Sequence, residues 1–433
     1  MTSKDPKHAF VWIWLPTETK PVVAGRLDAA GDMLRFRYGK SYLERDNLIS
    51  LYTPELPLTT ETIPPPRGLS IPGCIRDGSP DAWGRRVVFN RLFGSKGEAI
   101  KVHQLTELTY LLESGSDRIG ALDFQRSPTN YEPRSAQNVP LSELVKAAEI
   151  VEKGAPLSPD LAAALYHGTA IGGARPKALI EDDERKYVAK FSSSTDIYSV
   201  VKAEFLGMSL GRAIGLNVAA VHLCKTMKKD VLMIERFDRV KVKSGWQRRA
   251  MVSALTLFKL DEMMARYASY EELAEIIRHS FTDASATLKE LYRRLIFNLL
   301  IGNTDDHARN HAAFWDGQWL TLTPAYDLCP QPRTGNEASQ AMLIHGEDRS
   351  SRLMVALAAA ECFRFRAEEA RAEILRQIQV ISENWDGLCE EAEVNETDQN
   401  LFRTRQFLNP GIFEGLDDRE ILQAARKFRE LGS

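Results

Sequence analysis

The sequence predicts an α+β fold with two lobes and a small additional domain at the N-terminus. Residues 8–60 and 168–240 are rich in β-branched and aromatic segments, whereas the chain is mostly helical in pattern from about residue 250. A chain of 433 residues is too long for one ordinary hydrophobic core. We therefore expect an N-terminal α+β domain, a strand-rich lobe and a helical lobe, over residues 1–105, 106–240 and 241–433, respectively.

The N-terminal domain is predicted to begin with three strands and to end with a helix. The strands are HAFVWIWL, PVVAGRLD and DMLRFRYG, and AAGD between the last two supplies a hairpin turn. The proline-rich residues 57–73 must be irregular. Asp77 or Ser79 is expected to cap the following helix, with Pro80 at its first position.

The middle of the chain alternates helices and strands. Residues 105–114 and 141–154 are predicted helices, the second capped by Ser142 and ended by Gly154. A hairpin is predicted over residues 174–191, followed by a helix over 199–216 that ends at Gly215. Two strands follow over 218–226 and 230–238, and a late hairpin over 311–324 has Asp316-Gly317 at its turn.

Composition indicates an ordinary soluble protein of a reducing compartment. Hydrophobic residues make up 44% and charged residues 27% of the chain, and the net charge is -3, so neither nucleic acid nor an anionic membrane is expected as a direct partner. The basic run 241–249 is interpreted as a solvated hairpin. The five cysteines form no CxxC pair, which argues against disulfides and thiolate zinc. No leader peptide or membrane span is predicted, and a cytoplasmic location fits.

A dense polar loop, NTDDHARN at residues 303–310, follows an apolar run and is the strongest sign of a site. Phosphoryl transfer from a nucleotide needs backbone amides over the phosphates, a lysine with an acidic partner, an aspartate near the attacking hydroxyl, and Asn and Asp ligands for Mg²⁺. Asp305 and Asn310 have the five-residue step of a kinase catalytic loop. GTAIGGAR at 168–175, Lys190, Glu204, MIERFDR at 233–239 and Asp327 occur in the required order.

Each of these features has a simpler interpretation when taken alone. The glycines could form a plain turn, Lys190 and Glu204 could be solvated surface residues, and Asp327 could be a turn former. The competing site is a metal-dependent hydrolase that uses Asp305, Asp306, His307 and His311, but no further ligand cluster stands at a useful spacing. We expect His307 to bond a backbone carbonyl and stiffen the loop.

Several blocks of the sequence resemble the HipA family of bacterial toxin kinases. IGNTDDHARNH followed by TPAYDL resembles the family's IGNTD-x-H-x-KN and P-x-YD, and GGARPKALI resembles its GAQEK-type loop. VAKF, AEFLGMSLGRAIGLNV and IERFDR are similar to its lysine strand, following helix and hinge. DGSPDAWGRR resembles the PD-x-WGRR segment of its N-terminal domain. The resemblance runs over nearly the whole chain and implies a two-lobed, protein-kinase-like fold of HipA type.

The resemblance also implies a role for individual residues. Asp305 would be the catalytic aspartate with His307 beside it, and Asn310 and Asp327 would hold Mg²⁺. Lys190 would bind the ATP phosphates, with Glu204 on the following helix. The remaining nucleotide contacts would be the loop before the lysine strand, the hinge, and the residue before the metal aspartate: Ile171, Gly172, Gly173, Ala174, Glu235, Arg236, Phe237 and Tyr326.

Two positions depart from the family's pattern. The serine that is autophosphorylated in well-known members, an event that switches the kinase off, is replaced here by Ala170, and Thr169 is the candidate in its place. The loop then reads Arg175-Pro176 where members often have Gln-Glu. Because proline has a fixed φ and no N–H donor, this loop is expected to be stiffer and to offer one fewer amide to a phosphate.

The resemblance finally implies an activity and partners. It implies an ATP- and Mg²⁺-dependent serine/threonine kinase that acts as the toxin of a toxin–antitoxin pair, with an aminoacyl-tRNA synthetase as the known class of target and growth arrest or persistence as the outcome. The partner would be a HipB-like helix-turn-helix antitoxin, through which operator DNA is contacted. The alternatives are a catalytically silent corepressor and a small-molecule phosphotransferase.

Overall fold

The structure is a computed structural model that describes residues 5–93, 105–134, 139–153, 155, 158, 165, 175–193, 196–333 and 335–430. The chain divides into two compact units. Unit 1 comprises residues 1–195, 224–252 and 314–318, and unit 2 comprises residues 196–223, 253–313 and 319–433. The domain boundaries predicted at residues 105 and 240 stay predictions, because units defined by packing need not coincide with folding domains.

The first sheet of unit 1 contains the three strands predicted near the N-terminus. It has the order β3-β2-β1-β4 and is antiparallel, with β1 (His8–Ile13), β2 (Val22–Ala30), β3 (Met33–Tyr38) and β4 (Leu122–Gln125). Gly31 has φ +63° in the predicted turn between β2 and β3. The short helices of this region are α1 (Lys40–Leu43), α2 (Gly73–Arg76) and α4 (Glu107–Glu113).

Two predicted helix starts are wrong by a few residues. Helix α3 (Ala82–Phe93) is capped by neither Asp77 nor Ser79; instead the Gly84 amide donates to Asp81 Oδ1 at 3.0 Å. Helix α5 (Leu141–Glu152) begins before Ser142, so that residue lies inside the first turn and caps nothing. The partly buried Leu141 packs against the core and extends the helix backward. Gly154, its predicted end, lies outside the described residues.

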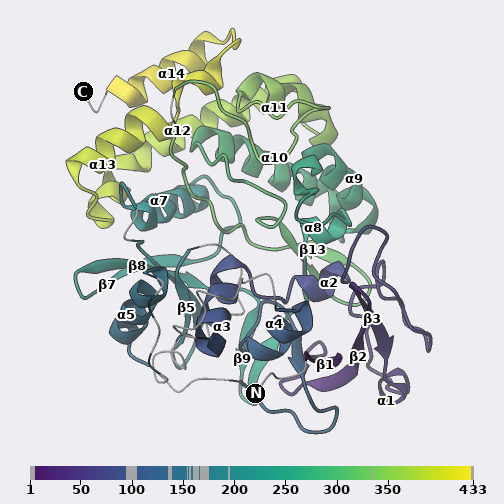
Figure 1. Ribbon diagram of the computed structural model, residues 1–433. Helices are drawn as coiled ribbons and strands as arrows, with labels where there is room; N and C mark the ends of the chain where they lie inside the picture. The colour runs from purple at the N-terminus through teal and green to yellow at the C-terminus, as the bar shows by residue number, and fades with distance from the viewer. Residues whose placement is uncertain are drawn as a thin grey trace. The chain divides into compact units, whose positions relative to one another are not determined.

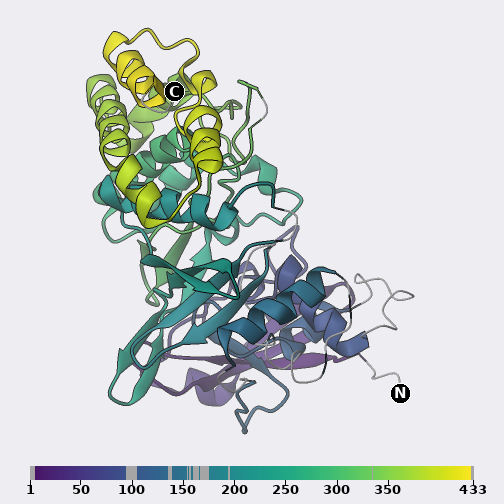
Figure 2. The ribbon, with the colours of Figure 1, turned by 90° about the vertical axis from the view of Figure 1, so that its left-hand side faces the viewer.

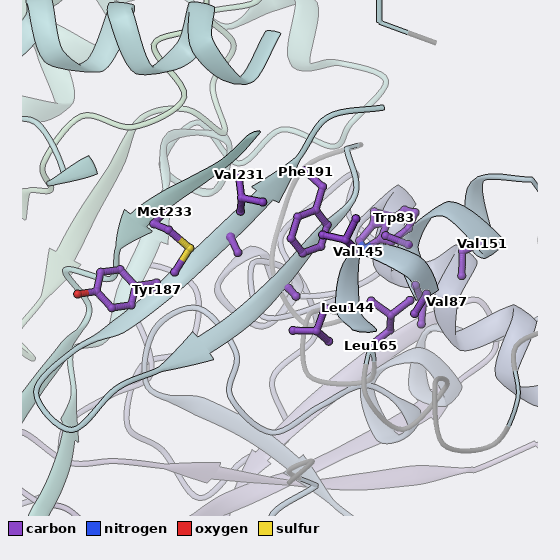
Figure 3. Close-up of a cluster of buried hydrophobic side chains, with 14 residues drawn as sticks. Trp83, Val87, Leu144, Val145, Val151, Leu165, Tyr187, Phe191, Val231 and Met233 are labelled. Carbon is purple, nitrogen blue, oxygen red and sulfur yellow. The ribbon is translucent and has the colours of Figure 1, made fainter. Parts of the chain in front are cut away.

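The second sheet of unit 1 has the order β5-β6-β8-β7 and includes the predicted hairpin. Its strands are β5 (Lys177–Glu181), β6 (Lys186–Phe191), β7 (Val221–Thr226) and β8 (Lys229–Glu235). Helices α3 and α5 lie against one face of this sheet (Figure 2). The buried cluster between them joins Trp83 and Val87 of α3 to Leu144 of α5 and to Phe191 and Val231 of the sheet (Figure 3).

The basic run 241–249 forms the hairpin that was predicted for it. Strand β9 (Arg239–Val242) pairs antiparallel with β10 (Gly245–Arg248), and the side chains of this pair are mostly exposed or half-buried. Strands β11 (Met251–Ser253), β12 (Ala312–Trp315) and β13 (Leu320–Leu322) form a three-stranded sheet in that order. Gly317, in the predicted turn between β12 and β13, has φ +105°.

Unit 2 is the helical part of the chain, as predicted (Figure 1). Its helix α10 (Ala284–Leu300) packs against α9 (Tyr270–Ser280), α11 (Leu353–Ala359) and α12 (Ala367–Glu391). Helix α12 in turn packs against α7 (Val200–Ala213) and α14 (Arg419–Glu430). The shorter elements are α8 (Ala254–Leu257), α13 (Glu396–Leu401), a π-turn (Phe402–Gln406) and three 3-10 turns (Ala265–Tyr267, Ala360–Phe363, Pro410–Phe413).

Two further observations concern the chain as a whole. All five cysteines are free thiols. Across the part of the chain that the structure describes, no helix is both long enough and apolar enough to cross a membrane.

Candidate active site

The polar loop 303–310 begins where the buried helix α10 ends. Gly302 has φ +69°, and a Cβ at this position would lie 2.6 Å from the Gln406 carbonyl oxygen, so a glycine is required. Asn303 then fixes the start of the loop, because its amide nitrogen donates to the Asn298 side chain at 3.0 Å. The loop is therefore held to the helix by backbone geometry and a buried hydrogen bond.

Asp306 points into the protein and is part of a buried network. It accepts a hydrogen bond from the Tyr270 hydroxyl, and its Oδ1 lies 3.0 Å from His311 Nε2. Burial alone would raise the pKa of Asp306, but His311 and the hydrogen bonds from His311 and Tyr270 outweigh it and lower the pKa. Asp306 and His311 are thus bonded to each other, and among the residues that the structure describes no three His, Cys, Asp or Glu side chains are grouped as a metal site of the alternative hydrolase would require.

Asp305 is exposed, although it directly precedes the buried Asp306. Its pKa is raised, first by loss of hydration and then by the nearby carboxylates of Asp327 and Asp306, whereas His307 opposes the shift. Asp305 and Asp327 are therefore close enough to repel each other. Two carboxylates held near one another gain from a cation or a proton between them.

Asn310 connects the loop back to Asp305. Its side-chain nitrogen donates to the Asp305 carbonyl oxygen at 3.2 Å, and its backbone N–H donates to the His307 carbonyl oxygen at 2.8 Å. Because the amide nitrogen is used in this way, the orientation of the side chain is fixed and its oxygen is the atom left for a metal. The five-residue step between Asp305 and Asn310 thus corresponds to a real hydrogen bond.

Asp327 lies on a second loop that is tied to the first. Its backbone has φ +59°, a left-handed conformation that aspartate tolerates better than most residues. Its carbonyl oxygen accepts from Asn303 Nδ2 at 3.4 Å, and the neighbouring Tyr326 hydroxyl donates to the Arg309 carbonyl oxygen at 2.6 Å. Asp305, Asn310, Tyr326 and Asp327 are therefore brought together within unit 2.

The Nδ1 atom of His307 does not make the predicted hydrogen bond to a backbone carbonyl. This atom is buried and has no hydrogen-bond partner among the described residues. Beside Asp305, His307 acts to lower the Asp305 pKa, against the effect of burial. The backbone of His307, rather than this nitrogen, stiffens the loop by accepting from Asn310.

The predicted lysine and its acidic partner belong to different units. Lys190 is on the central strand β6, where it pairs in register with Lys177 of β5 and Leu232 of β8. Glu204 is a buried residue of α7, 2% exposed, and not the surface residue of the simpler interpretation. The predicted role of this pair stays a prediction. Ile171, Gly172, Gly173, Ala174 and Thr169 lie outside the described residues.

The predicted hinge residues follow strand β8. Glu235 Oε2 accepts from the exposed Arg185 at 2.9 Å, and the Phe237 ring packs edge-on against Phe314 with centroids 5.9 Å apart. The Arg236 guanidinium is buried and bonds to Asp238 at 2.8 Å. An adenine contact by Arg236 would therefore have to use its backbone.

Sequence reasoning missed a buried ion cluster around Asp117. This carboxylate lies 3.1 Å from Arg236, 2.8 Å from Arg239 and 2.9 Å from Lys186. Burial alone would raise its pKa, but these cations lower it well below the ordinary value. Because Asp117 is more than a hundred residues before the arginines in the sequence, no spacing could have indicated the cluster. The ion cluster holds the backbone of the predicted hinge in place.

Comparison with known families identifies the chain. A family model for the HipA-like C-terminal domain matches residues 169–385, and a model for the HipA N-terminal domain matches residues 17–125. The chain belongs to the HipA family. The resemblance drawn from the sequence blocks is therefore confirmed.

Individual relatives are distant. The serine/threonine-protein kinase toxin HipA of Shewanella oneidensis is 26% identical over 183 residues, which cover 37% of this chain and 42% of the relative. Y4mE of Sinorhizobium fredii, a kinase by name, is 27% identical over 254 residues, 53% of this chain and 59% of the relative. The chain thus spans about half the length of these curated relatives.

A solved structure shows the HipA fold for almost the whole chain. The complex of Shewanella oneidensis HipA with HipB and its operator DNA contains a chain that matches with a TM-score of 0.62 at 16% identity. The match covers 98% of this chain and 95% of that chain. The predicted α+β, kinase-like fold of HipA type is confirmed.

Proposed function

We propose that this chain is an ATP-dependent serine/threonine protein kinase. The observation that carries the proposal is the arrangement of Asp305, Asn310 and Asp327 on two loops tied together by hydrogen bonds. A catalytic carboxylate with an Asn and an Asp for the metal is the set that phosphoryl transfer in kinases requires. Membership of the HipA family, with relatives that bear kinase names, supports the same activity.

The residues present fit a magnesium ion. The side-chain oxygens of Asn310 and Asp327 are hard oxygen ligands, which Mg²⁺ prefers, and Mg²⁺ completes its shell with waters and phosphate oxygens rather than with many protein groups. When bound, the ion would offset charge on the transferred phosphoryl group. The mutual repulsion of Asp305 and Asp327 is a second reason why a cation would be stabilised there.

In the proposed mechanism Asp305 orients the attacking hydroxyl. A loose phosphoryl-transfer transition state needs little early proton removal, so Asp305 need not be a strong base. Asp305 is exposed, which suits contact with a hydroxyl of a bulky protein substrate. Asp306 anchors the loop through its bonds to Tyr270 and His311 and so holds the adjacent Asp305 in position.

We also propose nucleotide contacts for Lys190 and the hinge, all of which belong to unit 1. Lys190 on the rigid central strand β6 would bind the ATP phosphates, and the backbone of Glu235 to Phe237 would line the adenine. The ion cluster of Asp117 supports this assignment, because it fixes the backbone on which adenine contacts would depend.

We further propose that the kinase acts as the toxin of a toxin–antitoxin pair. The solved complex with a matching fold holds HipA together with HipB and operator DNA. A HipB-like antitoxin that contacts DNA on behalf of the pair suits the mildly acidic charge of -3 on this chain. An aminoacyl-tRNA synthetase remains the proposed class of substrate.

The test is incubation of the purified chain with Mg²⁺ and γ-labelled ATP, first alone and then with cell lysate. A labelled protein band that disappears in the Asp305→Asn variant is the expected result. A labelled metabolite would instead support a small-molecule phosphotransferase. No transfer, together with intact antitoxin binding, would support the corepressor and overturn the proposal. Label on the chain itself would locate autophosphorylation, for which Thr169 is the candidate.

A further inference from the structure

A polar pocket lies in unit 2, in the segment that follows Asp327 in the sequence. Its volume is about 370 Å³, and its lining includes Arg333, Ser339, Ser351 and Arg352. This volume is at the lower end of the range for small-ligand sites. The pocket is formed without any residue of the candidate active site.

Arg333 brings an uncompensated charge to this pocket. Its Nε and Nη1 atoms are buried without a hydrogen-bond partner, and Nη2 donates to the Asn336 carbonyl oxygen. Within the described residues, no acid forms an ion pair with Arg333, and burial lowers its pKa. Arg333 is half-buried as a whole, so its two buried donors can be satisfied by water, by an ion or by the oxygens of a ligand that enters the pocket.

The backbone around Arg333 is organised rather than loose. The Ser351 amide donates to the Ala338 carbonyl oxygen at 2.8 Å, and the Gln340 amide donates to the Arg349 carbonyl oxygen at 2.8 Å, which pairs the two walls of the pocket. The Asn336 carbonyl lies directly against Gly411, where any side chain would collide with it. The arginine is therefore presented by a fixed frame.

The remaining lining is suited to an anion. Ser339 and Ser351 contribute hydroxyl groups, and Arg352 contributes a second guanidinium, which is 2.9 Å from the exposed Glu414. Glu337 is exposed and is the one acid among the lining residues. Two guanidinium groups with serine hydroxyls can satisfy several oxygens at once, which a phosphate offers and a chloride ion does not.

We propose that this pocket binds a terminal phosphate group, held mainly by Arg333. The phosphate could be carried on a serine or threonine side chain of a polypeptide, on a nucleotide, or be free inorganic phosphate, since all share the same terminal oxygens. The proposal does not require that the chain itself transfers phosphate.

Calorimetric titration of the full chain tests the proposal. The probes are a phosphoserine peptide, its unphosphorylated form, AMP and inorganic phosphate, without Mg²⁺ and in an Asp327→Asn background that weakens the proposed nucleotide site. We expect Arg333→Gln to weaken binding of the phosphorylated probes by about tenfold or more, as for loss of charged hydrogen bonds. The matched control Arg212→Gln removes the same charge from an exposed position on α7 and should change nothing.

The outcomes separate the sources of the phosphate. The probe that binds most tightly and depends on Arg333 identifies the source, and each of the three supports the site. Equal binding by Arg333→Gln and Arg212→Gln, or equal binding of the unphosphorylated peptide, would overturn it. If Arg333→Gln fails to fold, Ser339→Ala and Glu337→Gln are measured instead. Ser339→Ala should weaken phosphate binding, and Glu337→Gln should tighten it. Unchanged binding in one or both of these variants contradicts the proposal.

Discussion

Two groups of acidic residues in this protein have opposite environments. The pKa of Asp305 is raised by loss of hydration and by the nearby carboxylates of Asp327 and Asp306. No arginine is among the groups that shift this pKa. Asp117 and Asp238 are surrounded by arginines, and their pKa values are lowered. The second arrangement stabilises the fold, whereas the first one stores repulsion that a cation would relieve. The difference matches the catalytic and metal-binding roles proposed for the first group and a structural role for the second.

The largest effect is expected at Asp327. Asp327→Asn retains the size and the tolerance for a left-handed backbone, so the fold should be preserved. Removal of a metal carboxylate should abolish transfer and weaken Mg²⁺-dependent nucleotide binding by about 100-fold or more. The measurement is nucleotide affinity over a magnesium titration. Unchanged affinity at every magnesium concentration would remove Asp327 from the metal site.

The opposite behaviour is expected at Asp117. Asp117→Asn leaves Asp238 as the one carboxylate paired with both Arg236 and Arg239 among the described residues, and breaking a buried ion pair costs about 3 kcal/mol or more. The thermal unfolding midpoint should fall by several degrees. Asp28→Asn is the matched control, because its pair with Arg26 is exposed and is worth at most about 1 kcal/mol. Equal shifts in the two variants would mean that the cluster is not structural.

Acid should act through the same cluster. The pKa values of Asp117 and Asp238 are lowered in the folded protein, so the unfolded chain binds more protons below its own aspartate pKa of about 3.9. Stability is then fully present above that pH and is lost as the pH falls toward the folded values. Urea midpoints measured from pH 7 to pH 3 should decline less steeply in Asp117→Asn. An equally steep decline would assign acid sensitivity to other carboxylates.

The smallest effect, and the opposite sign, is expected for the stability of Asp305→Asn. Because the folded pKa of Asp305 is raised, its ionised form opposes folding at neutral pH. The variant should unfold at a slightly higher temperature than the wild type at pH 7, and this difference should shrink as the pH falls and Asp305 becomes protonated. A lower midpoint at pH 7 would show that Asp305 stabilises the fold instead.

Local patterns allowed much of the fold and part of the site to be predicted. The hairpin of β5 and β6, the glycine turns at Gly31 and Gly317, and the helix that ends before Gly215 all depend on short-range sequence signals. The five-residue step from Asp305 to Asn310 also lies within one loop, and it corresponds to a hydrogen bond in the structure.

Features that depend on distant contacts could not be predicted. Tyr270 of helix α9 donates to Asp306 of the polar loop, and Asp117 pairs with arginines that lie more than a hundred residues later in the sequence. The start of α5 was missed because core packing of Leu141 overrode the capping preference of Ser142. The burial of Glu204 likewise follows from how α7 packs and not from its own residue type.

The neighbouring carboxylates Asp305 and Asp306 are expected to serve phosphoryl transfer and the fold, respectively, and one paired measurement tests this division. Phosphoryl transfer and thermal unfolding are measured for Asp305→Asn and Asp306→Asn side by side. We predict that Asp305→Asn loses roughly 10²- to 10⁴-fold in transfer while it stays folded. Asp306→Asn should unfold at a clearly lower temperature, because it disrupts the buried bonds to Tyr270 and His311. Near-full transfer by Asp305→Asn, with transfer abolished in a fully stable Asp306→Asn, would contradict the account.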